Sequence, residues 1–141
     1  MPSREQFQSI CLTRLEEVKV LYEKGLYDGA NYLSGYVVET ALKARVCKIL
    51  ESDYPDSGEI SRSFLTHKFD TLVRLAGLSK ALDRESNTNT IFKTNWSIAT
   101  GWSEAERYSP IGTNDKLKIE ELISALTDNN NGVLTWIMKT W

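Results

Sequence analysis

Apolar residues recur at steps of three and four along most of the chain, which is the spacing of one face of an α-helix. The first such run begins after Ser3, a residue type that caps helices, and stops at Gly25. A second run covers residues 26–51 and is apolar on most sides, as expected of a buried central helix. Because the break between the runs is short, they should fold back on each other as a long antiparallel hairpin.

Three polar or small positions in the second run carry structural information. Gly35 lies in its middle, where glycine costs about 1 kcal/mol relative to alanine, so we expect another backbone to approach very closely there. Glu39 and Lys43 stand one turn apart and are expected to pair along the helix.

The middle of the chain shows shorter elements. Ser, Asp, Pro and Gly dominate residues 52–61 and predict a surface loop. Thr66 then caps a short helix over about residues 67–76, and residues 78–84 add one further turn. An aromatic helical stripe ends at Gly101 or just beyond it.

The last apolar run extends from Leu117 to Trp141 after a connection over residues 103–113. Its period continues across the Asn-Asn-Asn-Gly sequence at 129–132, which favours one long last helix, bent or frayed there, over two. No segment alternates as a strand would, and no repeat appears. The pattern therefore predicts an all-α fold, an antiparallel bundle of four to five helices with a long central hairpin, in a single domain over residues 1–141.

Composition narrows the chemistry. Cys11 and Cys47 fall on apolar helical faces and are expected to be reduced core residues of a cytoplasmic protein. With one histidine in the chain, no zinc site of the usual Cys/His type is expected, and neither a metal nor a cofactor is predicted. A Ser-His-Asp catalytic site built on His67 remains an alternative, although the sequence does not single out a serine for it. No apolar run reaches the length of a membrane span.

The net charge of −2 gives no overall attraction to nucleic acid, so RNA binding would need a local basic patch. One candidate patch combines the end of the central helix with the segment after it: Lys43, Arg45, Lys48, Arg62, His67, Lys68 and Arg74. The alternative is that these residues are ordinary solvated positions, partly neutralised by Glu39 and Asp70.

Three segments resemble the HEPN superfamily of small bacterial and archaeal helical-bundle proteins, and together they cover most of residues 5–138. They are YDGANYLSGYVVETALKA at 27–44, THKFDTLVRLAG at 66–77, and the aromatic helix followed by Arg107, Tyr108 and Pro110. The resemblance implies a helical fold with a long antiparallel pair, a homodimer, and a role in prokaryotic defence, toxin–antitoxin or stress systems.

Many HEPN proteins are metal-independent ribonucleases whose motif is arginine, four to six residues, then histidine. Arg62 and His67 satisfy that spacing. Because imidazole titrates near neutral pH, the histidine would move a proton while a 2′-hydroxyl attacks the phosphate, and the arginine would stabilise the charge on the phosphate oxygens. In the family, two such motifs meet across the dimer.

The match differs from the family pattern in two ways. The family's arginine usually precedes Asn, Asp or His on a late helix, whereas Arg62 precedes Ser63 in a loop-like region. On a continuous helix the two side chains would point about 140° apart, so they meet only if the chain turns between them. The alternative is that His67 opens the short helix and holds the loop to the bundle through a hydrogen bond, as in non-catalytic members.

Arg107 and Tyr108 also allow two interpretations. In the first, Arg107 forms a structural ion pair with Asp28 or Glu39 and ties the last loop to the hairpin. In the second, Arg107 and Tyr108, with Lys43, contact a phosphate or nucleotide. The second fits a non-catalytic HEPN-like module that binds a nucleotide or partners a small nucleotidyltransferase or another protein.

Overall fold

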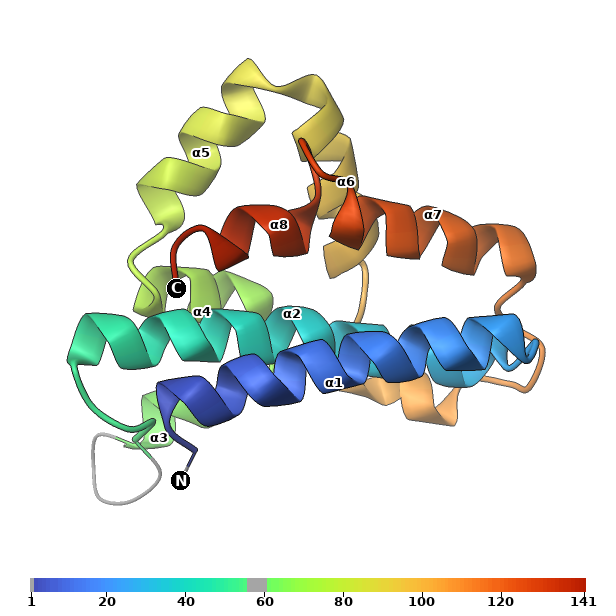
Figure 1. The fold of residues 1–141 in the computed structure, drawn as a ribbon, viewed down its shortest axis with the longest axis horizontal. Coiled ribbons are helices and arrows are strands. Elements are labelled where there is room, and N and C mark those ends of the chain that lie inside the picture. The colour runs from blue at the N-terminus through green and yellow to red at the C-terminus, as the bar shows by residue number, and fades with distance from the viewer. Residues whose placement is uncertain (1, 56–60) are drawn as a thin grey trace.

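The computed structural model describes residues 2–55 and 61–141, so residues 56–60 of the predicted loop lie outside the described residues. Within these ranges the chain is helical and has no strand (Figure 1). The elements are α1 (Arg4–Glu23), α2 (Tyr27–Leu50), α3 (Ser61–Phe64), α4 (Phe69–Leu75), α5 (Ser79–Thr88), α6 (Thr90–Thr100), the 3₁₀ helix η1 (Glu104–Tyr108), α7 (Lys116–Thr127) and α8 (Val133–Met138). The predicted all-α class is confirmed.

The predicted hairpin of α1 and α2 is also confirmed (Figure 1). Ser3 and Gln6 form a capping box at the start of α1, in which each side chain bonds the other residue's backbone N–H. Gly25 makes the turn with a φ of 75°, in the left-handed region that favours glycine. Thirteen of the 24 residues of α2 are buried.

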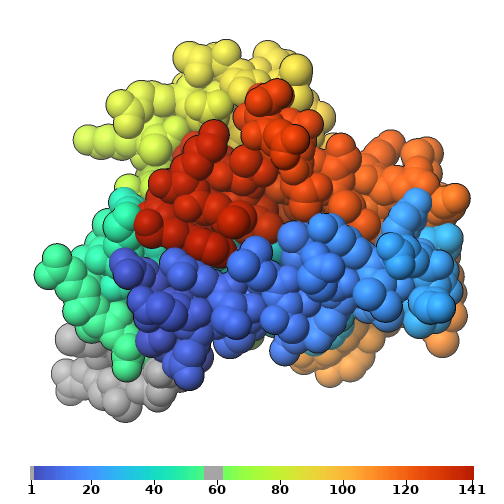
Figure 2. All heavy atoms as spheres, in the orientation of Figure 1, coloured from blue at the N-terminus to red at the C-terminus, as the bar shows by residue number. Residues whose placement is uncertain are grey.

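The other elements surround α2, which packs against α1, α4, α6, α7, α8 and η1. In Figure 1, α7 and α8 run above the hairpin, and α5 and α6 form an outer arm. Figure 2 shows that atoms of α1 and α8 meet on this face and cover the middle of α2, whose C-terminal end stays visible at the left. Within the described ranges, no helix is long and apolar enough to cross a lipid bilayer.

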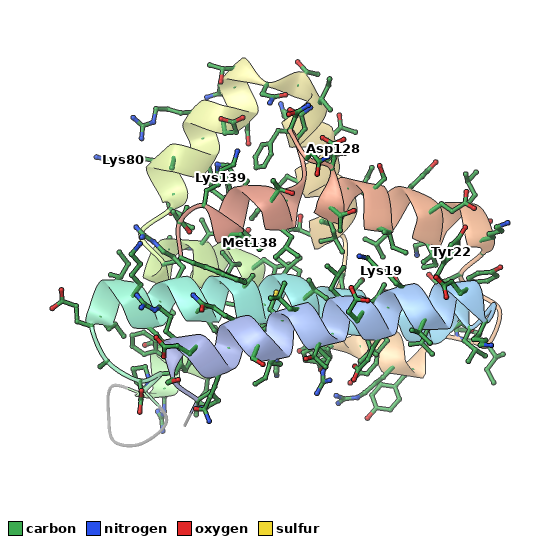
Figure 3. The ribbon with its side chains drawn as sticks, viewed as in Figure 1. Lys19, Tyr22, Lys80, Asp128, Met138 and Lys139 are labelled. Atoms are coloured by element: carbon green, nitrogen blue, oxygen red, sulfur yellow. The ribbon has the colours of Figure 1, made fainter. Side chains whose placement is uncertain are left out.

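The prediction of one long last helix is wrong, because the chain forms a turn between α7 and α8, at Asp128 (Figure 3). Asp128 Oδ2 accepts the backbone N–H groups of Asn130 at 3.1 Å and Asn131 at 2.7 Å. A Cβ on Gly132 would lie 2.5 Å from the Asp128 carbonyl oxygen. A short acidic side chain and a glycine therefore end the helix although the apolar period continues.

Two other boundaries also differ from prediction. The single turn expected at 78–84 is the ten-residue helix α5, and Asn89 caps the start of the following α6 by accepting the Phe92 N–H at 3.1 Å. Thr66 accepts the Lys68 N–H in a turn, so α4 begins at Phe69, later than expected. The described residues thus form eight α-helices, more than the four to five expected, because the additional ones are short or arise from the split.

Gly35 is closely approached, but by a side chain and not by the backbone that was expected. The indole of Trp102 lies directly over this residue, where an added Cβ would be 2.0 Å from Trp102 Cδ2. The indole Nε1–H also donates to the Tyr32 carbonyl oxygen at 3.0 Å, which fixes the ring on α2. The segment that follows α6 is therefore held to the central helix by one aromatic side chain.

Both cysteines are free thiols in the core. The Cys11 thiol donates to the Val37 carbonyl oxygen at 3.3 Å across the contact between α1 and α2. Burial raises the pKa of Cys11 to about 12 and that of Cys47 to about 11. Each thiol therefore stays protonated near neutral pH.

We predict that Gly35→Ala lowers the free energy of unfolding by about 2 kcal/mol or more, because the new methyl group overlaps the Trp102 indole. Gly29→Ala in the same helix is the matched control, since its Cβ would make an ordinary 3.5 Å contact with Leu21. That variant should be as stable as the wild type or more stable by about 0.5–1 kcal/mol. Urea unfolding followed by circular dichroism compares the two, and equal effects would contradict the close approach.

Candidate functional site

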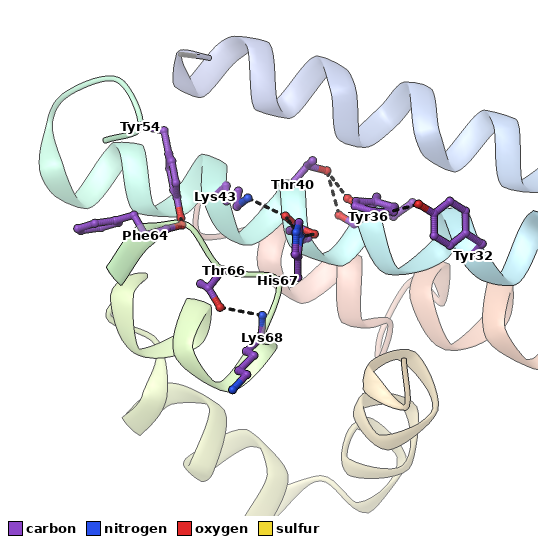
Figure 4. Close-up of polar contacts among 11 residues, drawn as sticks. Tyr32, Tyr36, Thr40, Lys43, Tyr54, Phe64, Thr66, His67 and Lys68 are labelled. Atoms are coloured by element: carbon purple, nitrogen blue, oxygen red, sulfur yellow. Dashed lines mark hydrogen bonds and ion pairs between the residues drawn. The ribbon is translucent and has the colours of Figure 1, made fainter. Parts of the chain in front are cut away.

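A row of polar side chains lies on the face of α2 toward the segment before α4 (Figure 4). Tyr32, Tyr36, Glu39 and Lys43 form this row, here called the α2 stripe, and their three- and four-residue spacing puts them on one side of the helix. The Tyr32 and Tyr36 hydroxyls are 3.2 Å apart. Burial, followed by the hydrogen bond with Tyr32, raises the pKa of Tyr36 to about 12.

Glu39 is the only acidic residue in the stripe, and its side chain is 4% exposed. Lys43 Nζ donates to Glu39 Oε1 at 2.6 Å, which confirms the predicted pair. His67 Nδ1 lies 3.0 Å from both oxygens of the same carboxylate. The buried charge of Glu39 is therefore compensated by one group from its own helix and one from a distant segment.

This contact contains the hydrogen bond expected if His67 holds the loop to the bundle. Because both carboxylate oxygens are acceptors, the Nδ1 atom must carry the hydrogen and donate it. The His67 side chain remains 47% exposed. Among the described residues its Nε2 atom has no hydrogen-bond partner, so the anchoring and catalytic interpretations are compatible.

A hollow of about 440 Å³ lies beside His67. Lys68 and Arg74 supply positive charge to its lining, while Asp70 and Glu104 supply negative charge. Trp102 also lines it. The hollow can therefore accommodate a ligand with anionic groups and with hydrogen-bond donors.

Three other residues of the predicted basic patch, Lys43, Arg45 and Lys48, bond to other parts of the chain. Arg45 Nη1 donates to the Thr140 carbonyl oxygen at 2.9 Å, and Lys48 Nζ donates to the Trp141 carbonyl oxygen at 2.6 Å. These two cations hold the C-terminal segment against α2. Since Lys43 pairs with Glu39, the cations that remain near His67 are Lys68 and Arg74.

Arg62 lies on α3 and is exposed. The chain does turn between Arg62 and His67, since Thr66 N–H donates to the Phe64 carbonyl oxygen at 2.9 Å. Nevertheless, the two side chains form no hydrogen bond with each other, and the partner of His67 is Glu39. The structure of one chain therefore does not bring together the two residues of the predicted motif.

Arg107 and Tyr108 are exposed residues of η1, which packs against α2. The Arg107 guanidinium is 4.8 Å from the centre of the Tyr108 ring, and Tyr108 is 77% exposed. The phenols of Tyr108 and then Tyr32 raise the pKa of Arg107. An exposed guanidinium stacked on an aromatic ring remains available for a phosphate or a carboxylate of another molecule.

The predicted ion pair of Arg107 with Asp28 or Glu39 is wrong. Glu39 is occupied by Lys43 and His67, while the partners of Asp28 are uncharged N–H groups. Asp28 accepts from the Gly112 N–H at 2.7 Å and from the Asn114 backbone and side chain at 3.0 and 2.8 Å. Asp28 does tie the last loop to the hairpin, but through uncharged N–H groups of Gly112 and Asn114, which the sequence pattern did not predict.

Three aromatic residues of the site were not among the predicted site residues, namely Tyr32, Tyr36 and Trp102. The Tyr36 ring contacts the rings of His67 and Trp102 edge-on, with centroids 6.2 and 5.1 Å apart. Tyr36 stands three residues before Glu39, so helical spacing would have placed it on the same face. Trp102 arrives from a different segment, and only Gly35 signalled its position.

The part of the chain that the structure describes holds no group of three or more His, Cys, Asp or Glu residues placed to bind a metal ion. Comparisons of the chain with family models, with curated proteins and with solved structures give no match. The functional argument therefore depends on the geometry of the α2 stripe, His67 and the adjacent hollow.

We predict that the stability conferred by Asp28 is lost in acid. The hydrogen bond from Gly112, followed by those from Asn114, lowers its pKa below the ordinary value of 3.8, so the folded state favours the ionised carboxylate. The wild type should have a higher unfolding free energy than Asp28→Asn, and this difference should be at its largest above about pH 5. It should disappear as the pH falls through the lowered pKa of Asp28. Denaturation at several pH values measures it, and Asp83→Asn, an exposed carboxylate on α5, is the control.

Proposed function

We propose that this chain is a HEPN-like module that acts as a metal-independent endoribonuclease, with His67 as the residue that moves the proton. The observation that carries the proposal is the contact of His67 Nδ1 with the buried Glu39 carboxylate, at 3.0 Å, combined with an imidazole that is half exposed. A carboxylate that orients a histidine and fixes its tautomer is a common arrangement for general acid–base catalysis.

The chemistry needs a base and an acid. The base takes the proton of a ribose 2′-hydroxyl, whose oxygen attacks the neighbouring phosphorus and forms a 2′,3′-cyclic phosphate. The acid gives a proton to the departing 5′-oxygen, so the protons balance without a metal ion. His67 Nε2 performs one of these transfers, and the resemblance to HEPN proteins supports a homodimer in which a second copy performs the other.

The charge near His67 supports a phosphodiester substrate. Lys68 and Arg74 line the hollow beside the imidazole and would stabilise charge on the phosphate oxygens. Lys43 has a different task in this proposal, because its ammonium group neutralises the buried Glu39 carboxylate. A cytoplasmic defence, toxin–antitoxin or stress role follows from the same resemblance.

We predict that the purified protein cleaves RNA in EDTA to products with 2′,3′-cyclic phosphate ends, and that His67→Ala abolishes this cleavage. The reason is that His67 is the only histidine in the sequence and the proton carrier of the proposed mechanism. Circular dichroism of the variant checks that it folds. Cleavage that persists in a folded variant would remove His67 from the mechanism.

A pair of arginine variants identifies the cation that stabilises the phosphate. Arg74→Ala should lower the cleavage rate by about 10²-fold, because Arg74 lines the hollow with His67. Arg62→Ala removes the same charge from an equally exposed position and should lower the cleavage rate much less than Arg74→Ala does. A larger loss of rate in Arg62→Ala than in Arg74→Ala would restore the arginine–histidine motif. It would also require Arg62 and His67 to meet in another arrangement, such as across a dimer.

The second candidate function is a non-catalytic module that binds a nucleotide or a partner protein such as a small nucleotidyltransferase. The stacked pair of Arg107 and the exposed Tyr108 favours it. We then expect no RNA cleavage in any buffer and saturable nucleotide or partner binding that Arg107→Ala abolishes. Binding that is unchanged in Arg107→Ala would exclude this surface.

A further inference from the structure

A second hollow, of about 240 Å³, opens between α2, α6 and α7. Trp102 lines it and also lines the hollow beside His67. The inner end is formed by Asn31 and Ser34, which are 6% and 2% exposed. Its walls include the apolar side chains of Ile98 and Leu122. The pocket thus has an aromatic side, apolar walls and a polar floor.

The floor offers two hydrogen-bond acceptors. Asn31 Nδ2 donates to Glu106 Oε2 at 3.3 Å, whereas Asn31 Oδ1 has no hydrogen-bond partner among the described residues. The Ser34 hydroxyl donates to the Asn31 carbonyl oxygen at 2.7 Å, so its own oxygen is left to accept. Among the described residues, the fully buried side-chain polar atom without a partner is Asn114 Oδ1, so Asn31 Oδ1 keeps access to solvent. Asn31 and Ser34 stand three residues apart on one face of α2, and the floor therefore offers two neighbouring acceptors to a bound molecule.

We propose that this pocket binds a guanine base of the RNA substrate, an inference that rests on the ribonuclease function proposed above. Guanine presents its N1–H and 2-amino groups side by side, which suits two neighbouring acceptors. Adenine and cytosine present one amino group beside a ring acceptor, and the single N–H of uracil lies between two carbonyl groups. Base-edge pairing of this kind is what discriminates nucleotides.

The remaining lining residues suit the rest of a nucleotide. The Trp102 indole offers an aromatic surface for the base, and stacking of this kind is common in single-stranded RNA recognition. Lys118 and Glu121 are exposed residues of α7 at the pocket. The ammonium group of Lys118 can bind a phosphate, and the carboxylate of Glu121 can accept from a ribose hydroxyl. Because Trp102 lines both hollows, a bound guanine would lie close to His67.

Calorimetric titration with GMP, IMP and UMP tests the pocket without requiring catalysis. IMP lacks only the 2-amino group, so it should bind about tenfold more weakly than GMP, and UMP should bind more weakly still. GMP should also shift the NMR resonance of the Trp102 indole Nε1–H. Ser34→Ala should weaken GMP binding about tenfold. Ser97→Ala, an exposed serine that likewise bonds a backbone carbonyl one turn earlier, should leave binding unchanged.

The outcomes separate this inference from the ribonuclease proposal. Equal affinities for GMP, IMP and UMP, no GMP binding, or wild-type affinity in Ser34→Ala would each overturn the guanine pocket. RNA cleavage by a protein that binds no GMP would retain the ribonuclease and reject the pocket. If the protein binds GMP selectively but cleaves no RNA, the ribonuclease proposal is rejected. The role of the pocket as a subsite for an RNA substrate is then rejected with it. Selective binding, its loss in Ser34→Ala and preferred cleavage near guanine would support both.

Discussion

The compensation of one buried carboxylate connects the fold to the proposed chemistry. Glu39 lies in the central helix with almost no solvent exposure, and an uncompensated charge in such a place costs several kcal/mol. Lys43 supplies one partner from the same helix. The second partner, His67, must come from outside, so the segment before α4 is drawn onto α2. The interaction that docks this segment is also the one that orients the imidazole.

Trp102 imposes a second constraint at the next turns of the same helix. Its ring fits over α2 because Gly35 has no side chain, and its indole N–H reaches the Tyr32 carbonyl oxygen. The chain between α6 and η1 is thereby fixed in position, with one hollow beside His67 and another beside Asn31.

The sequence predicted the features that depend on local spacing. Helical periodicity located the hairpin, and the four-residue step from Glu39 to Lys43 gave the ion pair. The unusual Gly35 indicated a close contact but did not identify Trp102. The partner of Arg107 was predicted incorrectly, because choosing among carboxylates requires knowing which are already occupied. The turn at Asp128 was missed for a related reason, since side-chain capping of a backbone turn does not disturb the apolar period.

The two cysteines give the hairpin built-in chemical reporters. Cys11 lies on α1, bonded across to Val37 of α2, and Cys47 lies near the far end of α2. Both are buried and protonated in the folded chain. A thiol reagent reaches Cys11 only after the helices separate locally, whereas Cys47 borders a surface hollow and needs a smaller opening. The rate of labelling at each position therefore measures how often that section of the hairpin opens. The two rates together distinguish fraying at one end from cooperative separation of the whole helix pair.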